Sequence, residues 1–284
     1  MNPFLFSISW LILLLSTDID TPKEDVTLSQ RPISDTVFNT LIWADEFEEE
    51  GAINTKNWFH QTKLPPWGSW FGGLINHYTN RIENSYVDNG YLNLVAIKES
   101  FEDQGHTKEY TSARLNSKFA FTYGRVEFRA KMPSGIGTWP AIWMLNKEIN
   151  EDGAYWQQQG FGKTNWPDCG EIDILEHWGS KQDSVQSAVH TKASHGHEVT
   201  TLGGQKIIDA SNQFHTYCLV WTAEKMVFSV DGNQHYEYNP KVRNDETWPF
   251  DSDQYFLLNI AIEPNIDANF KKSAMQVDYI RVYQ

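Results

Sequence analysis

The segment Met226-Val-Phe-Ser-Val-Asp-Gly232 is typical of a β-strand that runs into a tight hairpin turn. Successive side chains of a strand point to opposite faces, and Asp-Gly suits the left-handed conformations of a two-residue turn. Residues 91–97, 124–132 and 276–283 also alternate with a period of two between turn residues. Because no long segment holds a helical period, the sequence predicts an all-β domain. A jelly-roll sandwich of two antiparallel sheets is the leading architecture.

The first 39 residues differ in character from the rest of the 284-residue chain. The apolar run from Phe4 to Leu15 has the length of a signal-peptide core and is too short to span a bilayer. It lacks a nearby basic residue and a small-x-small cleavage site, and a buried helix is the alternative interpretation. A polar tract follows. We therefore expect a signal peptide at residues 1–16, a linker at 17–39 and one domain at 40–284, in a secreted or extracytoplasmic protein without a membrane span.

The composition favours a carbohydrate ligand. Aromatic residues make up 14% of the chain and include 12 Trp, which is more than core packing alone requires. Flat indole faces stack well on sugar rings. The formal net charge of −14 disfavours nucleic acid and anionic membranes and suits a neutral glucan, although acidity that only keeps the protein soluble explains it equally well. The two cysteines, Cys169 and Cys218, form either one disulfide or, as we favour, two buried thiols.

Residues 170–178 read Gly-Glu-Ile-Asp-Ile-Leu-Glu-His-Trp and concentrate three carboxylates in one predicted strand. Regular alternation places Glu171 and Asp173 on one face and turns Glu176 away. One extra residue in a β-bulge would return Glu176 to that face, about 5–5.5 Å from Glu171. Carboxylates held this close raise at least one pKa, as glycoside hydrolysis through a covalent intermediate requires. The alternative is an edge strand with an acidic outer face, where interleaved lysines would be expected.

The pattern Glu-x-Asp-x-x-Glu between Gly170 and Gly179 resembles the catalytic signature of glycoside hydrolase family 16. Its bulged form is found in laminarinase-like endo-β-1,3-glucanases, agarases and carrageenases. The resemblance covers roughly residues 41–284 and rests on several segments in the same order, which are Leu41-Ile-Trp-Ala-Asp-Glu-Phe47, Tyr78-Thr-Asn-Arg81, Thr111-Ser-Ala-Arg114, Tyr123-Gly-Arg-Val-Glu127, Gly137-Thr-Trp-Pro-Ala-Ile-Trp-Met-Leu145, His190-Thr191 and Val277-Asp-Tyr-Ile-Arg-Val-Tyr283. It implies a jelly roll with a concave substrate cleft, in an enzyme that hydrolyses β-1,3-glucan of the laminarin type, or mixed β-1,3/1,4-glucan, with retention.

The resemblance also implies roles for individual residues. Glu171 would be the nucleophile, Glu176 the general acid and base, and Asp173 a group between them that tunes their protonation. Substrate contacts are implied for Trp139, Trp143, Asn80, Arg81, His190 and Trp178. Trp139 is the favoured sugar platform, and the other five have structural alternatives: core packing for the Trp143 and Trp178 indoles, a satisfied turn for residues 80–81, and a structural strand position for the histidine.

Family members often bind one structural Ca²⁺ on the sheet face away from the cleft, and Asp278 and Gly90 match the ligand positions. The acidic tract at residues 45–50 could supply a third oxygen ligand. The alternative is that Asp278 only caps a strand edge. No catalytic cofactor is implied, and we expect a monomer.

Two kinds of competing function remain at this point. An agarase or related β-galactanase, or a transglycosylase, would share the catalytic strand. A glucan-recognition module on the same fold belongs to a different class of protein. Such modules typically lose a catalytic carboxylate, and all three are present here. The sequence therefore favours an enzyme whose partner is a polysaccharide.

Overall fold

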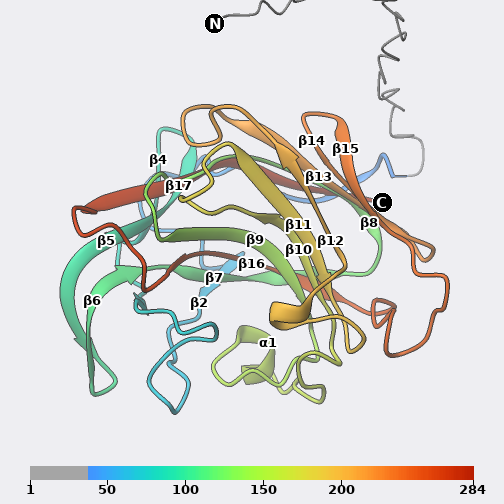
Figure 1. Cartoon of the computed structure of the whole chain (residues 1–284), viewed down its shortest axis with the longest axis horizontal. Coiled ribbons are helices and arrows are strands. Elements are labelled where there is room, and N and C mark those ends of the chain that lie inside the picture. The colour runs from blue at the N-terminus through green and yellow to red at the C-terminus, as the bar shows by residue number, and fades with distance from the viewer. Residues whose placement is uncertain (1–37) are drawn as a thin grey trace, which may run out of the picture. The chain divides into compact units, whose positions relative to one another are not determined.

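The computed structural model describes residues 38–284, and these form two β-sheets packed face to face (Figure 1). The predicted signal peptide, and the predicted linker up to residue 37, lie outside the described residues. The first sheet contains, in spatial order, β15 (Asn233–Tyr238), β14 (Met226–Val230), β13 (His215–Trp221), β8 (Gly124–Lys131), β17 (Lys272–Tyr283), β5 (Tyr91–Asp103), β6 (His106–Ser112) and β3 (His77–Tyr78), with β1 (Leu41–Asp45) beside β17 and β4 (Ser85–Asp88) beside β5.

The second sheet carries the acidic strand. Its spatial order is β12 (Leu202–Lys206), β11 (Ser184–His190), β10 (Glu171–Glu176), β9 (Thr138–Asn146), β16 (Gln254–Ile262), β7 (Arg114–Phe121) and β2 (Trp58–His60). Neighbouring strands are antiparallel in both sheets, apart from β3, which runs parallel to β6. Within residues 38–284, the helices are the single-turn α1 (Tyr155–Gln158) and the 3-10 turn η1 (Gly196–Glu198). The predicted all-β sandwich is confirmed.

The hairpin predicted at residues 226–232 forms between β14 and β15. Val230 pairs with Asn233 across the turn. Asp231 and Gly232 have φ angles of +49° and +77°, as a type I′ turn requires. The other three predicted strands correspond to β5, β8 and β17.

The apolar core lies between the two sheets and follows from alternation. In β8 every second residue is buried, including Val126 and Phe128. From the opposite sheet, Phe256 and Leu258 of β16 enter the same cluster. All nine residues of β16 are nevertheless buried, because the side chains between them, such as Leu257, are covered on the outer face by a second hydrophobic cluster.

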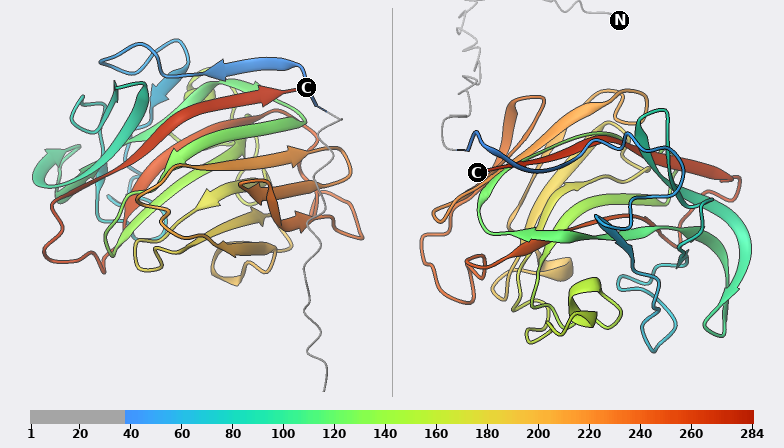
Figure 2. Two further views of the ribbon diagram at one scale, coloured as in Figure 1. Left: turned by 90° about the horizontal axis from the view of Figure 1, so that it is seen from above. Right: turned by 180° about the vertical axis from the view of Figure 1, so that it is seen from behind.

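Two long connections lie on the outer side of the second sheet. They are residues 61–76 between β2 and β3 and residues 147–170 between β9 and β10, which include α1. Figure 1 and the rear view in Figure 2 both place them on the same side of this sheet. We call the outer face of the second sheet, to which these connections contribute, the cleft face.

Two smaller expectations concern membrane insertion and the cysteines. The described part of the chain contains no helix of the length and hydrophobicity needed to cross a bilayer. Cys169 is a buried free thiol whose Sγ donates to the Gly170 carbonyl at 3.3 Å. The two cysteines of the chain are not bridged to each other, as we favoured from the sequence, but Cys218 is half-buried, so the prediction of a buried thiol is correct for Cys169 and wrong for Cys218.

Candidate active site

A β-bulge in β10 brings the three predicted carboxylates to one face of the sheet. Between Asp173 and Glu176, three steps along β10 correspond to two along β9, and the pairing with β11 shifts in the same interval. Ile174 and Leu175 consequently both enter the core, while Glu171, Asp173 and Glu176 share the cleft face. The bulge predicted from the sequence is confirmed.

Ser187 of β11 holds the bulge from the core side. Its Oγ donates to the Ile174 carbonyl at 2.8 Å in a buried contact. His235 Nε2 lies 3.0 Å from the same Oγ. Because the hydroxyl proton points at Ile174, the imidazole N–H donates and the hydroxyl accepts. Burial lowers the pKa of His235 to about 4, so the ring is neutral at neutral pH and its one proton lies on Nε2.

Glu176 lies beside a pair of indoles. Trp139 Nε1 donates to Glu176 Oε1 at 3.0 Å, and Gln186 Nε2 reaches Oε2 at 3.5 Å. The Trp139 ring stacks on Trp178, with centroids 5.6 Å apart and planes 25° apart. Glu176 itself is only 8% exposed. The structure thus brings the predicted Trp139 to the carboxylate that the resemblance assigns as the acid, and the predicted Trp178 packs against Trp139.

Glu171 and Asp173 share a histidine. Trp166 Nε1 donates to Glu171 Oε2 at 3.1 Å. His190 Nε2 lies 3.6 Å from Glu171 Oε1 and 3.2 Å from Asp173 Oδ2. The backbone N–H of Gly196 donates to His190 Nδ1 at 3.2 Å, so the neutral ring carries its proton on Nε2. His190 Nε2 therefore lies near both carboxyl groups without a hydrogen bond to either, and Asp173 Oδ2 has no hydrogen-bond partner among the described residues.

Burial raises the pKa of all three carboxyl groups. For Asp173 it raises the pKa to about 8. For Glu176 the pKa also rises to about 8, through burial first and then the charge of Asp173. The pKa of Glu171 rises through burial and Asp173, while His190 and the Trp166 hydrogen bond act to lower it. Since neighbouring buried carboxylates cannot all be ionised, this site keeps protons at neutral pH.

Trp143 of β9, which pairs with Asp173 of β10, is fixed by polar contacts at the edge and the face of its ring. Its Nε1 donates to Asn259 Oδ1 at 2.7 Å. The Arg114 guanidinium lies 5.0 Å from the Trp143 ring and 5.1 Å from the Trp70 ring. Arg114 is itself held by both carboxylate oxygens of Glu151, at 2.9 and 2.8 Å. The half-buried indole is thereby held in one orientation on the cleft face.

The carboxylates and the histidine also resemble a metal-binding group. The ligand atoms of Glu171, Asp173 and His190 lie within 4.8 Å of one another. However, His190 Nδ1 accepts the Gly196 N–H, so Nε2 bears the ring proton and has no lone pair to offer a metal. In this tautomer the imidazole therefore does not suit metal ligation.

Asp278 and Gly90, the predicted Ca²⁺ ligands, lie on the first sheet. Val277 pairs with Leu92, so the register places Asp278 beside the residues that precede Leu92, where Gly90 forms the turn from β4. A carboxylate next to a turn carbonyl suits calcium. The Asp278 carboxylate is also paired with Arg129, which would compete with a cation. Calcium binding stays a prediction.

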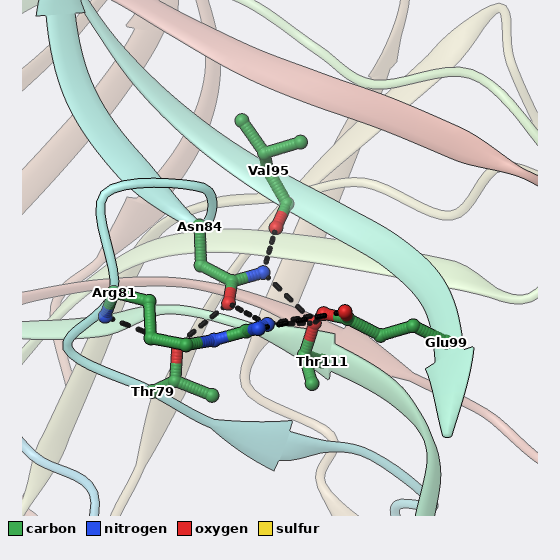
Figure 3. Close-up of polar contacts among 6 residues, drawn as sticks. All are labelled: Thr79, Arg81, Asn84, Val95, Glu99 and Thr111. Atoms are coloured by element: carbon green, nitrogen blue, oxygen red, sulfur yellow. Dashed lines mark hydrogen bonds and ion pairs between the residues drawn. The ribbon is translucent and has the colours of Figure 1, made fainter. Parts of the chain in front are cut away.

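Among the described residues, no hydrogen bond or ion pair joins Asn80 or Arg81 to the three carboxylates. Figure 3 shows the Arg81 guanidinium within a polar network that includes Asn84, Glu99 and Thr111. Asn80, the neighbouring residue, is exposed. The satisfied-turn alternative accounts for the Arg81 contacts, and sugar binding by either residue stays a prediction.

Gln186 and Trp166 contact the carboxylates but were not singled out from the sequence. Gln186 lies four residues before His190 on β11, so strand alternation places both side chains on the same face and could have predicted its position. Trp166 lies in the irregular connection 147–170, and its position depends on loop packing that no sequence period encodes.

Comparisons with known proteins point to one family. The model described as glycosyl hydrolases family 16 matches residues 77–281. A beta-glucanase of Rhodothermus marinus is 38% identical over 259 residues, which cover 86% of this chain and 85% of that protein. The structure of LamA from Zobellia galactanivorans in complex with laminaritriose and laminaritetraose is 44% identical, with a TM-score of 0.79, and covers 87% of this chain and 100% of its own. A mutant of SCLam, a non-specific endo-beta-1,3(4)-glucanase, is 35% identical with a TM-score of 0.78, over 89% and 98% of the two chains.

Proposed function

This chain belongs to glycosyl hydrolases family 16 and is a glycoside hydrolase, and from this we propose that it is a retaining endo-hydrolase of β-1,3-glucan of the laminarin type, or of mixed β-1,3/1,4-glucan. The observation that carries the proposal is the bulge that turns Glu171, Asp173 and Glu176 to one face. The relatives named above, among them a glucanase and a protein bound to laminari-oligosaccharides, support the choice of glucan.

In the proposed mechanism, Glu171 attacks the anomeric carbon while Glu176 protonates the departing oxygen. The leaving chain departs with that proton, and a covalent glycosyl-enzyme forms on Glu171. Glu176, now ionised, then takes a proton from a water whose oxygen attacks the anomeric carbon. The bond to Glu171 breaks, and the sugar is released with its original anomeric configuration. The raised pKa of Glu176, about 8, supports the role of acid because it keeps the proton in place at neutral pH.

Asp173 and His190 would divide the protons between the two glutamates. A carboxyl with a pKa of about 8 is neutral at pH 6 to 7, so Asp173 does not oppose a charge on Glu171. The Trp166 N–H donates to Glu171 and His190 lies 3.6 Å from it, and both act to lower the pKa of Glu171. The retaining mechanism requires an ionised nucleophile, so we assign the negative charge of the resting site to Glu171 and protons to Asp173 and Glu176, although burial and the charge of Asp173 raise the pKa of Glu171 as well.

Substrate class is tested by incubating the protein with laminarin, lichenan, agarose and carrageenan and separating the products by size. We expect laminarin to be cut far faster than agarose and to yield short oligosaccharides early, as random internal cleavage does. Cleavage of agarose with laminarin untouched would support the alternative of an agarase or related β-galactanase. Products longer than the starting chains would indicate a transglycosylase.

The catalytic roles are tested with two variants. Glu171→Gln should abolish turnover while the fold and glucan binding remain. Glu176→Ala should be as damaging on laminarin but much less so on an aryl glycoside, whose leaving group needs no proton. With Glu176→Ala, added azide should give a β-glycosyl azide. An α-configured first product, observed directly by NMR, would contradict the retaining mechanism.

Three finer statements belong to the same proposal. We propose that the protein is exported after removal of the segment around residues 1–16 and acts as a monomer. Asp278 and the Gly90 carbonyl would hold a structural Ca²⁺ outside the catalytic site. The only role assigned to that ion is to stabilise the first sheet, since hydrolysis in this family needs no catalytic cofactor.

A further inference from the structure

Two large aromatic side chains stand exposed on the connection between β2 and β3. Trp67 is 62% exposed and Phe71 is 61% exposed. Their ring centroids lie 5.3 Å apart with an interplanar angle of 68°. Adjacent exposed aromatic rings cost solvation free energy and usually mark a binding surface, unlike single scattered apolar residues.

The connection holds these rings in place rather than leaving them to swing freely. Gly68 N–H donates to the Pro65 carbonyl at 2.9 Å, and Ser69 Oγ donates to the Leu74 carbonyl at 2.8 Å. Between the two exposed aromatics, Trp70 is only 2% exposed and packs on Tyr78 at 4.8 Å. The buried indole therefore anchors the segment and fixes its two exposed neighbours outward.

The aromatic pair is continuous with the catalytic face. Trp70 and Trp139 belong to one hydrophobic cluster, and a Cβ at Gly72 would lie 3.7 Å from the Trp139 ring. Trp139 in turn donates to Glu176. Gly72, the residue after Phe71, therefore lies against the indole that contacts the proposed acid, which places the exposed pair on the Glu176 side of the cleft face.

Few large aromatic side chains are exposed in the described part of the chain. In residues 38–284, the exposed large hydrophobic side chains that are aromatic are Trp67, Phe71 and Trp166. Trp166 donates to Glu171, so it flanks the proposed nucleophile, whereas the Trp67 and Phe71 pair extends from the side of the acid. Ile208, by contrast, is an exposed aliphatic residue of the connection between β12 and β13.

We propose that Trp67 and Phe71 form a distal binding site for the glucan chain, beyond Trp139 on the Glu176 side. This inference rests on the proposed function. Each ring would stack on the C–H face of one sugar. The large angle between the rings suits a chain that turns between successive residues, as a β-1,3-linked chain does. Two rings offer far less than the roughly 800 Å² per partner that a stable protein interface buries, which favours a sugar chain over a protein.

The test compares Trp67→Ala, Phe71→Ala and the double variant with the matched control Ile208→Ala, which truncates an exposed apolar residue of 72% exposure. For each, kcat/KM is measured on long laminarin and on a short laminari-oligosaccharide aryl glycoside. We expect the ratio of the two values to fall about fivefold to tenfold in each aromatic variant, and further in the double variant, because a stacking contact is lost only with the long chain. Trp67→Phe should restore most of the ratio, and Ile208→Ala should leave it at the wild-type value.

Several outcomes would overturn the proposal. An unchanged ratio in the double variant would do so, as would an equal loss on long and short substrates, which indicates a structural role. A wild-type dimer that becomes monomeric in the double variant, with the ratio unchanged, would identify a second copy of the chain as the occupant. If the enzyme cuts agarose and not laminarin, the proposed glucan substrate is wrong. The same ratio is then measured on long and short agarose substrates. Failure of the proposed substrate is thereby distinguished from failure of the proposed aromatic binding site.

Discussion

Replacing Ser187 with alanine should remove the side-chain hydrogen bond that holds the β-bulge of β10, which orients Glu176. The Ser187 hydroxyl donates to the Ile174 carbonyl at 2.8 Å and accepts from His235 at 3.0 Å, and Ser187 is 1% exposed. Alanine fits the space but leaves a buried carbonyl and a buried N–H without partners. Such a loss costs about 1–3 kcal/mol of unfolding free energy.

The effect on catalysis should exceed the effect on stability. Without its partner, the Ile174 carbonyl is free to relax the bulge, and Glu176 follows two residues later on the same strand. A displacement of about 1 Å in a catalytic group can cost about 100-fold in rate. Because Glu176 protonates the leaving group, we expect the loss on laminarin to be larger than the loss on an aryl glycoside.

The assay measures denaturant unfolding and kcat/KM on both substrates for Ser187→Ala and for the control Ser229→Ala. Ser229 is also buried, at 2% exposure, and its hydroxyl has no hydrogen-bond partner among the described residues. Its removal should cost little or nothing. The reasoning is refuted if the two variants behave alike, or if Ser187→Ala loses the same factor on laminarin and on the aryl glycoside.

Four further predictions concern pH, calcium and export. Activity on laminarin should fall on the alkaline side near pH 8, where Glu176 loses its proton, and a pH–rate profile of Glu176→Ala on an aryl glycoside should lack that limb. Glu176→Gln should raise the unfolding free energy relative to wild type at pH 9 but not at pH 4, measured by denaturant titration. Saturating Ca²⁺ should raise the melting temperature, by mass action worth about 3 kcal/mol at a hundredfold excess over Kd, and Asp278→Ala should remove the response. N-terminal sequencing of secreted protein should find a start between about residues 16 and 24, and an intact Met1 would contradict export.

The catalytic strand could be predicted from the sequence because the spacing of its three carboxylates does not fit the regular alternation of a β-strand. Glu171 and Asp173 alternate correctly, whereas Glu176 reaches their face only through an extra residue. The hairpin at Asp231 was predictable for a similar reason, since its left-handed turn has a short local signature. Local stereochemistry thus carried both inferences.

The features that could not be predicted from the sequence depend on contacts between residues far apart in the chain. The Arg81 network joins a turn to residues of β5 and β6, 18 and 30 positions away, and no local pattern distinguishes this role from sugar binding. The burial of all nine residues of β16 likewise hides its alternation, because both faces of that strand are covered. Trp166 reaches Glu171 through an irregular loop, so its position follows from tertiary packing alone.

The raised carboxyl pKa values mean that the proposed active site opposes folding as the pH rises. For Glu176 the ordinary value is 4.5 and the folded value about 8. Below pH 4.5 the group is protonated in both states and costs nothing. Between pH 4.5 and about 8 the folded state binds the proton more tightly than the unfolded state, so stability falls with rising pH. At about 1.4 kcal/mol per pH unit this interval corresponds to at most about 5 kcal/mol, a share of which is common to Asp173 because the two charges interact. An amide at position 176 keeps an oxygen for Trp139 and removes the titration. Its stabilising effect should therefore appear only above pH 4.5, whereas a gain of equal size at pH 4 would mean that packing, and not charge, is the cause.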